Sequence, residues 1–337
     1  MKKVLSILLV VMFMAALVSC DGSQGLEFTS CGISQGLEFT LNNDGESYSV
    51  TGIGTCTDTD IVIPSSYKGL PITSIGNWAF VGCKYIISIE IPDSVTSIGY
   101  HAFFECTSLT RIEIPDSVTS IDASSFPYCN SLTNIEVDTN NQYYKSIDGN
   151  LYTKDGKTLI RYAIGKEATS FTIPDSVISI GEEAFSNCIY LTSIEIPDTV
   201  TSIGDDAFSG CLSLTNIKIS DSVTSIGYSV FHSCVSLTSI EIPDSVTNIG
   251  DYAFSNCRSL TSIDIPDSVI SIGVGSFYNC ISLTSITIPA SVTSISEGAF
   301  EYSTSLTIYC EATSKPSGWD YFWNPDDRPV VWGYTSE

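Results

Sequence analysis

The sequence predicts a repeat solenoid, a fold in which short coils of similar sequence stack in one direction. Two observations predict it: a phenylalanine recurs with a period of 23 residues, and a cysteine follows most of these phenylalanines three residues later. A unit this short cannot bury its own apolar side chains, so stacked units must share a continuous core. The phenylalanines are Phe80, Phe103, Phe126, Phe185, Phe208, Phe231, Phe254, Phe277 and Phe300. The cysteines, called the ladder cysteines below, are Cys83, Cys106, Cys129, Cys188, Cys211, Cys234, Cys257 and Cys280.

Each unit predicts two extended segments and one turn. The segment L-T-x-I-x-I alternates apolar and polar residues and ends at a proline, which is typical of a short strand. The segment S-V-T-S-I-G predicts a second short extended stretch, and A-F-x-x-C predicts a tight helical or irregular turn with an inward phenylalanine. We expect the strands of successive units to form one parallel sheet, with neighbours about 4.8 Å apart.

The unit, with its I-G-x-x-A-F signature, resembles the leucine-rich repeat of the BspA-like, Treponema-type family over residues 37–334. This resemblance implies a leucine-rich-repeat solenoid: a curved right-handed coil with a parallel β-sheet on its concave face and short strands and turns elsewhere. It also implies a surface protein, since proteins of this family are often adhesins.

The amino-terminal residues 1–19 predict an export signal, because two lysines precede an apolar run that is too short to be a stop-transfer helix. The run ends in Leu17-Val18-Ser19-Cys20, which resembles the lipobox of bacterial lipoproteins and implies lipidation of Cys20. An ordinary cleaved signal is the alternative. We therefore expect an extracytoplasmic lipoprotein, anchored to a membrane by acyl chains and exposed at the cell surface, with residues 20–36 as a tether.

The predicted solenoid spans residues 72–307 and has one interruption. Residues 137–172 lengthen the step from Phe126 to Phe185 and contain two Asp-Gly turns around a short alternating segment, which is typical of a hairpin. We interpret this insert as a variant coil that continues the stack; a dedicated binding protrusion is the alternative. Open solenoid ends expose core, so residues 37–71 and the aromatic-rich residues 308–337 are interpreted as caps.

Twelve cysteines in an exported chain would ordinarily suggest disulfides. The ladder cysteines occupy equivalent positions, so their side chains should point in parallel, a poor geometry for a disulfide. We interpret them as small buried hydrophobic groups in place of the asparagine found in other leucine-rich repeats. A ladder also spreads ligands along a line, whereas zinc and calcium need ligands that converge on one point. No metal or cofactor is predicted.

A row of mostly acidic residues is expected to project from the concave sheet, because strand side chains alternate between faces. Its candidate ligand-binding residues, called the strand-face charges below, are Glu90, Arg111, Glu113, Glu136, Glu195, Lys218, Glu241 and Asp264. Carboxylates about 5 Å apart in water repel each other by only about 1 kcal/mol, so the row is tolerable without a ligand. A solvated face and a face that binds a basic or polar partner are equally compatible with this pattern.

A second acidic column follows the strand-ending proline or its serine replacement, and we interpret it as turn-forming, since an aspartate carboxylate can accept backbone N–H bonds in a turn. These residues are Asp93, Asp116, Asp175, Asp198, Asp221, Asp244 and Asp267. The formal net charge of -24 disfavours nucleic acid as a partner. The sequence lacks recognisable hydrolase and phosphate-binding motifs, and its two histidines, His101 and His232, lie on separate coils, so no enzyme is predicted.

The hypothesis that follows is a protein-binding scaffold whose acidic concave face takes a host matrix protein or a bacterial surface component. The alternative is a carbohydrate-binding or structural envelope protein that uses Trp319, Trp323 and Trp332 as sugar contacts. A cap also needs large apolar side chains, and we favour that role for these tryptophans.

Overall fold

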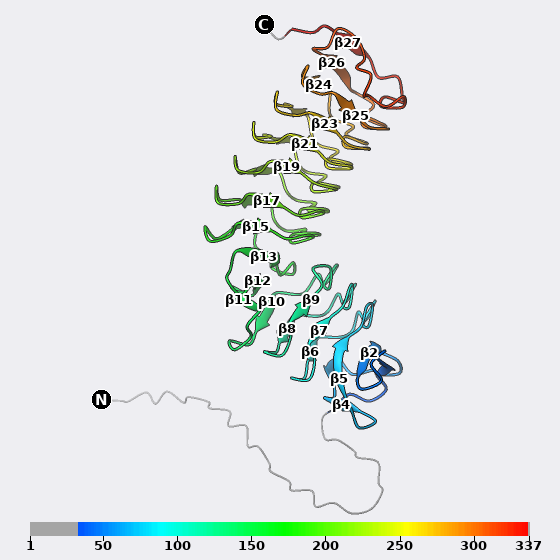
Figure 1. Cartoon of the computed structure of the whole chain (residues 1–337), viewed down its shortest axis with the longest axis vertical. Helices are drawn as coiled ribbons and strands as arrows, with labels where there is room; N and C mark the ends of the chain where they lie inside the picture. The colour runs from blue at the N-terminus through cyan, green and yellow to red at the C-terminus, as the bar shows by residue number, and fades with distance from the viewer. Residues whose placement is uncertain (1–32, 336–337) are drawn as a thin grey trace, which may run out of the picture. The chain divides into compact units, whose positions relative to one another are not determined.

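The computed structural model describes residues 33–335, and these form a parallel β-solenoid of about 12 turns without any helix (Figure 1). Each regular coil contributes one strand to each of two rows. The A-F-x-x-C segment forms turns rather than a helix. The predicted solenoid is therefore confirmed, with a second row of paired strands in place of isolated extended stretches.

The first row contains the L-T-x-I-x-I strands. They are β3 (Asp60–Val62), β6 (Ser88–Glu90), β8 (Arg111–Ile114), β10 (Asn134–Val137), β14 (Ser170–Thr172), β16 (Ser193–Glu195), β18 (Asn216–Lys218), β20 (Ser239–Ile240), β22 (Ser262–Ile263), β24 (Ser285–Ile288), β26 (Thr307–Cys310) and β27 (Val330–Trp332). Neighbours pair in parallel with a shift of one repeat, as when Ile194 on β16 pairs with Ile217 on β18. We call the solvent-facing side of this row the strand face.

The second row contains the S-V-T-S-I-G strands. They are β5 (Leu70–Ile75), β7 (Ser97–Ile98), β9 (Ser120–Ile121), β13 (Thr158–Arg161), β15 (Ser179–Ile180), β17 (Ser202–Ile203), β19 (Ser225–Ile226), β21 (Asn248–Ile249), β23 (Ser271–Ile272) and β25 (Ser294–Ile295). Before it lie β1 (Glu38–Leu41), β2 (Tyr48–Gly52) and β4 (Ser66–Tyr67), and β1 pairs antiparallel with β2, which pairs in parallel with β5.

The core consists of the ladders that the period predicts. The repeated phenylalanines are buried, and neighbouring rings stack with centroids 5.2 Å apart for Phe185 and Phe208 and 5.4 Å apart for Phe208 and Phe231. Burial of one such side chain contributes on the order of 2 kcal/mol. Because each ring contacts the next, neighbouring coils form one continuous apolar core, and no coil has a core of its own.

The ladder cysteines are buried and free, as predicted, and six of the eight also donate a hydrogen bond to the preceding coil. The Cys234 thiol donates to the Phe208 carbonyl at 3.2 Å, and the Cys257 thiol donates to the Phe231 carbonyl at 3.1 Å. At the equivalent position of the last coil, the Ser303 hydroxyl donates to the Phe277 carbonyl at 2.6 Å. The position therefore selects a small side chain with a donor, which corrects the purely hydrophobic interpretation.

The insert adds β11 (Tyr144–Ile147) and β12 (Asn150–Thr153), which pair antiparallel with each other, and β12 pairs antiparallel with β13. Strand β13 then pairs in parallel with β15, so the second row resumes. In the first row, the Ile135 N–H on β10 donates to the Gly149 carbonyl in the β11–β12 turn. The expected single sheet is therefore wrong. The insert separates β10 from β14, because a hairpin occupies the place of a strand, and farther along the row a single bridge joins β18 to β20 while β22 and β24 belong to different sheets.

The segment after β26 packs on the last coil. Trp319 and Trp323 are buried, and the Trp319 indole N–H donates to the Val292 carbonyl at 3.0 Å. The Trp323 ring lies edge-on to the Phe300 ring, with centroids 5.9 Å apart. These contacts are what a cap requires. The alternative use of Trp319 and Trp323 as sugar contacts is wrong, because their rings face the core.

Candidate functional site

The strand face presents the predicted charges to solvent. Strand alternation buries the flanking isoleucines, and every strand-face charge is exposed except Glu136, which is half-buried. The register aligns the row, since Glu113 pairs with Glu136 and Glu195 pairs with Lys218. The structure thus shows these residues exposed and in register, and their role in ligand binding stays a prediction. Cys20, the predicted lipidation site, lies outside the residues that the structure describes.

Arg111 partly neutralises the acidic row on the amino-terminal side of the insert. The Arg111 guanidinium forms ion pairs with Glu136 at 2.5 Å and with Glu113 at 3.2 Å. The Asn134 amide also donates to Glu136, at 2.7 Å. Arg111 therefore holds together two carboxylates that would otherwise repel across the strand pair, although exposed pairs of this kind contribute at most about 1 kcal/mol each.

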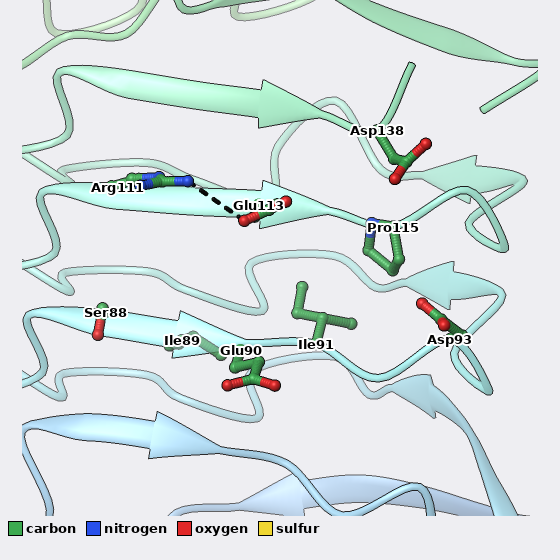
Figure 2. A pocket seen from close by; sticks show the side chains of 9 residues that line it. All are labelled: Ser88, Ile89, Glu90, Ile91, Asp93, Arg111, Glu113, Pro115 and Asp138. Carbon is green, nitrogen blue, oxygen red and sulfur yellow. Dashed lines mark hydrogen bonds and ion pairs between the residues drawn. The ribbon is translucent and has the colours of Figure 1, made fainter. Parts of the chain in front are cut away.

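A hollow of about 400 Å³ lies beside this cluster, between β6 and β8. Figure 2 shows Glu90 on β6, Arg111 and Glu113 on β8, and the turn carboxylates Asp93 and Asp138 at one end of the hollow. The lining thus includes four carboxylates and the Arg111 guanidinium, with the two aspartates at the end of the hollow away from Arg111 (Figure 2). The hollow is open and lined by polar groups, so it is suited to a basic side chain rather than to an apolar ligand.

Beyond the insert, the row continues with a different balance of charge. Lys218 lies between Glu195 and Glu241, but among the described residues it forms no ion pair within 4.0 Å. Glu195 instead accepts a hydrogen bond from the Thr172 hydroxyl at 3.1 Å. The strand face therefore has two acidic segments, one on either side of the insert, rather than the single column that was expected.

The threonines beside this row serve the stack itself. Their hydroxyls donate to the backbone carbonyl one repeat earlier, as Thr192 does to Thr169 at 2.9 Å and Thr215 does to Thr192 at 3.1 Å. In contrast, the second aspartate column forms no side-chain hydrogen bonds in the described part of the chain, and its turns are closed by backbone bonds such as Val200 N–H to Pro197 carbonyl. The prediction that these aspartates lie in turns is therefore confirmed, whereas the expected carboxylate contacts to the turn backbone are wrong.

Sequence reasoning missed a second hollow, which lies on the turn face, the surface formed by the I-G-x-x-A-F-x-x-C segments. It has a volume of about 450 Å³, and both histidines of the chain line it together with Glu183 and Asp206. Although these histidines lie on separate coils, the fold brings them to one hollow. The signal that could have located it is the missing phenylalanine between Phe126 and Phe185.

Within residues 33–335, no cluster of three or more histidine, cysteine or acidic side chains is arranged to hold a metal ion. Burial raises the pKa of the Cys129 and Cys280 thiols to about 12, so these ladder cysteines remain protonated and unreactive.

The described residues also include no helix with the length and hydropathy of a membrane span.

Comparison with known proteins agrees with this architecture. A family model described as a BspA type leucine rich repeat region matches residues 54–152, 162–243 and 224–314. The crystal structure of the pneumococcal vaccine antigen PcpA is similar, with 22% identity and a TM-score of 0.64 over 86% of this chain and 83% of that one. A leucine-rich repeat protein from Eubacterium ventriosum shares 24% identity, with a TM-score of 0.54 over 85% and 95% of the two chains. No curated protein matches the chain. At these identities, the likeness to solved structures establishes the fold.

Proposed function

Because the chain belongs to the BspA-type leucine-rich repeat family, we propose that it is an extracytoplasmic, non-enzymatic scaffold that binds a protein partner through its acidic strand face. The observation that carries this proposal is the exposed, register-aligned row of strand-face charges, which a solenoid repeats at regular spacing. A basic protein could place several of its cations along such a row at once. The partner would be a host matrix protein or a bacterial surface component.

The acidic segments give the proposal its electrostatic test. Glu90, Glu195 and Glu241 are exposed and are not paired with a cation in the structure, so changing all three to glutamine should remove charge without breaking an ion pair. Binding of the full chain to purified host matrix proteins and to bacterial surface extracts is measured before and after the change. We expect binding to weaken at least tenfold in the triple variant, and to weaken in the unchanged protein as salt is added.

A matched control removes the same charge elsewhere. Glu46, Glu297 and Asp327 are exposed and lie off the strand face, so their amide variants should leave binding unchanged. Equal losses in both triple variants would show that net charge, and not the strand face, governs the interaction. Unchanged binding in the strand-face variant would remove this face from the proposal.

Anchoring by lipid at Cys20 is the second part of the proposal, and it is supported by the Leu17-Val18-Ser19-Cys20 sequence after the apolar run. Labelling cells with a fatty-acid analogue tests it directly. The label should be incorporated into the unchanged chain and into a Cys31→Ala control, and it should be absent from Cys20→Ala. Labelling of Cys20→Ala would contradict lipidation at this residue.

A further inference from the structure

The turn face has a gap where the insert coil lacks the A-F-x-x-C turn. Residues 162–169 connect β13 to β14, whereas residues 181–192 connect β15 to β16 and include the A-F-x-x-C turn. In regular coils, backbone N–H groups of this turn donate to the next coil, as Phe185 does to the Ala207 carbonyl at 2.8 Å. In the insert coil, the Tyr162 N–H makes the equivalent bond to the Ala184 carbonyl, but only a short turn at Ile164 and Gly165 follows, without the A-F-x-x-C segment. The hollow of about 450 Å³ lies at this gap, and we call it the turn-face hollow.

A buried arginine fills the interior of the gap. Arg161 is only 1% exposed, and its guanidinium donates to the carbonyls of Phe126 at 3.2 Å, Ser186 at 3.4 Å and Glu183 at 2.5 Å. It also lies 3.8 Å from the Glu183 carboxylate. The Arg161 guanidinium therefore makes its hydrogen bonds within the protein and is not available to bind a ligand in the hollow.

Two carboxylates line the hollow. Glu183 accepts a hydrogen bond across the gap from the Ser124 hydroxyl at 2.9 Å, which fixes its position. Asp206 lies on the next coil, and its half-buried side chain lines the same hollow. Burial, reinforced by the neighbouring Glu183, Asp205 and Glu182 carboxylates, raises the pKa of Asp206 to about 6. At neutral pH this carboxylate is ionised, and within residues 33–335 it has no cation partner.

Aromatic and imidazole rings complete the lining. Phe104 and Tyr128 pack edge to face, with ring centroids 5.3 Å apart, and His101 packs against Phe104 at 5.1 Å. Burial lowers the pKa of His101 and of His232, so both imidazoles are neutral at pH 7. The hollow therefore combines negative charge with ring faces, a pairing that favours an organic cation because ring faces attract positive charge.

We propose that the turn-face hollow binds the ammonium group of a lysine side chain presented by a partner protein, with Glu183 and Asp206 as its counter-charges. This site is separate from the strand face and does not depend on the function proposed for that face. A lysine fits because its compact charge is carried on an apolar stem, which can lie against Phe104 and Tyr128 while the ammonium reaches the carboxylates.

The two histidines make the site directly observable. The chain contains only His101 and His232, so the imidazole region of its proton NMR spectrum reports on the hollow alone. The full chain is titrated with Nα-acetyl-lysine methylamide at pH 7.5. We expect saturable shifts of both imidazole signals, with a dissociation constant of roughly 1 mM for a single side chain. The same compound acetylated at Nε, which has no charge, should produce no shift.

Asp206→Asn is the decisive variant. Asp206 has a φ of 53°, in the left-handed region that asparagine tolerates well, so the substitution should preserve the turn. We expect the variant to weaken binding at least tenfold while its imidazole signals remain those of a folded protein. Glu113→Gln, on the strand face, is the matched control and should bind normally.

Three results would overturn the proposal: no saturable shift with the lysine compound, equal shifts with its acetylated form, or unchanged affinity in Asp206→Asn. A fourth arm separates the source of the ammonium group. If 1,5-diaminopentane binds more tightly than lysine compounds, including a peptide with a central lysine, then the hollow takes a free diamine and the assignment to a protein side chain is wrong.

Discussion

The regular coils and the insert coil solve the same packing problem with different chemistry. In the regular coils, a stacked phenylalanine and a cysteine hydrogen bond join each coil to the next. In the insert, Tyr162 takes the ring position, stacking 5.4 Å from Phe185, and Arg161 joins the neighbouring turns through their carbonyls. Repetition therefore yields a uniform surface, whereas the one departure from it opens a hollow on the turn face and divides the strand face.

The largest expected loss of stability comes from a substitution that removes the buried arginine of the insert coil. Arg161→Met leaves three carbonyls without this donor and the Glu183 carboxylate without its buried partner. We expect a loss of about 3–5 kcal/mol in the free energy of unfolding, measured by urea denaturation. Arg111→Met, which removes an exposed ion pair on the strand face, should cost less than about 1 kcal/mol. Similar small losses in both variants would show that the buried guanidinium does not hold the insert coil in place.

The regular coils can be tested at one ladder cysteine. Cys257→Ala removes the thiol that donates to the Phe231 carbonyl and leaves a small cavity, so we expect a loss of about 1–2 kcal/mol in the free energy of unfolding. Cys257→Ser should cost less than half as much, because Ser303 already makes the equivalent bond in the last coil. A serine variant as unstable as the alanine variant would mean that the thiol acts only by filling volume.

Removing an ionisable group at the turn-face hollow should have a smaller effect on the free energy of unfolding, and this substitution should stabilise the protein instead of destabilising it. The pKa of Asp206 is about 6 in the folded chain and about 3.9 when unfolded, so folding disfavours its carboxylate. This penalty is small at pH 4 and below, grows between about pH 4 and 6, and is fully present above about pH 6. After discounting for solvent screening, Asp206→Asn should stabilise the protein by about 1 kcal/mol at neutral pH and by much less at pH 4. Stabilisation that is equal at both pH values would contradict this origin.

The features that could be predicted from the sequence are those that recur once in every 23-residue repeat. The inward phenylalanines, the parallel strands and the exposed strand-face charges all depend on equivalent residues one repeat apart, so nine copies of the pattern support each assignment. The insert has one copy of its own pattern. Strand alternation does place Arg161 on the same side as the buried Leu159, but a charged residue at an inward position is unexpected until its acceptors are known. Those acceptors come from coils that lie far from it in the sequence, which local pattern does not reveal.

The smallest expected effect concerns the threonines of the strand face. The Thr215 hydroxyl and the Thr215 backbone N–H both donate to the Thr192 carbonyl, at 3.1 and 3.0 Å. Because the backbone bond already satisfies this carbonyl, and valine keeps the branched shape that strands favour, Thr215→Val should change the free energy of unfolding by less than about 0.5 kcal/mol. Urea denaturation of Thr215→Val and Cys257→Ala under the same conditions compares their losses in the free energy of unfolding. A loss above about 1 kcal/mol would show that the hydroxyl ladder, like the thiol ladder, joins the coils.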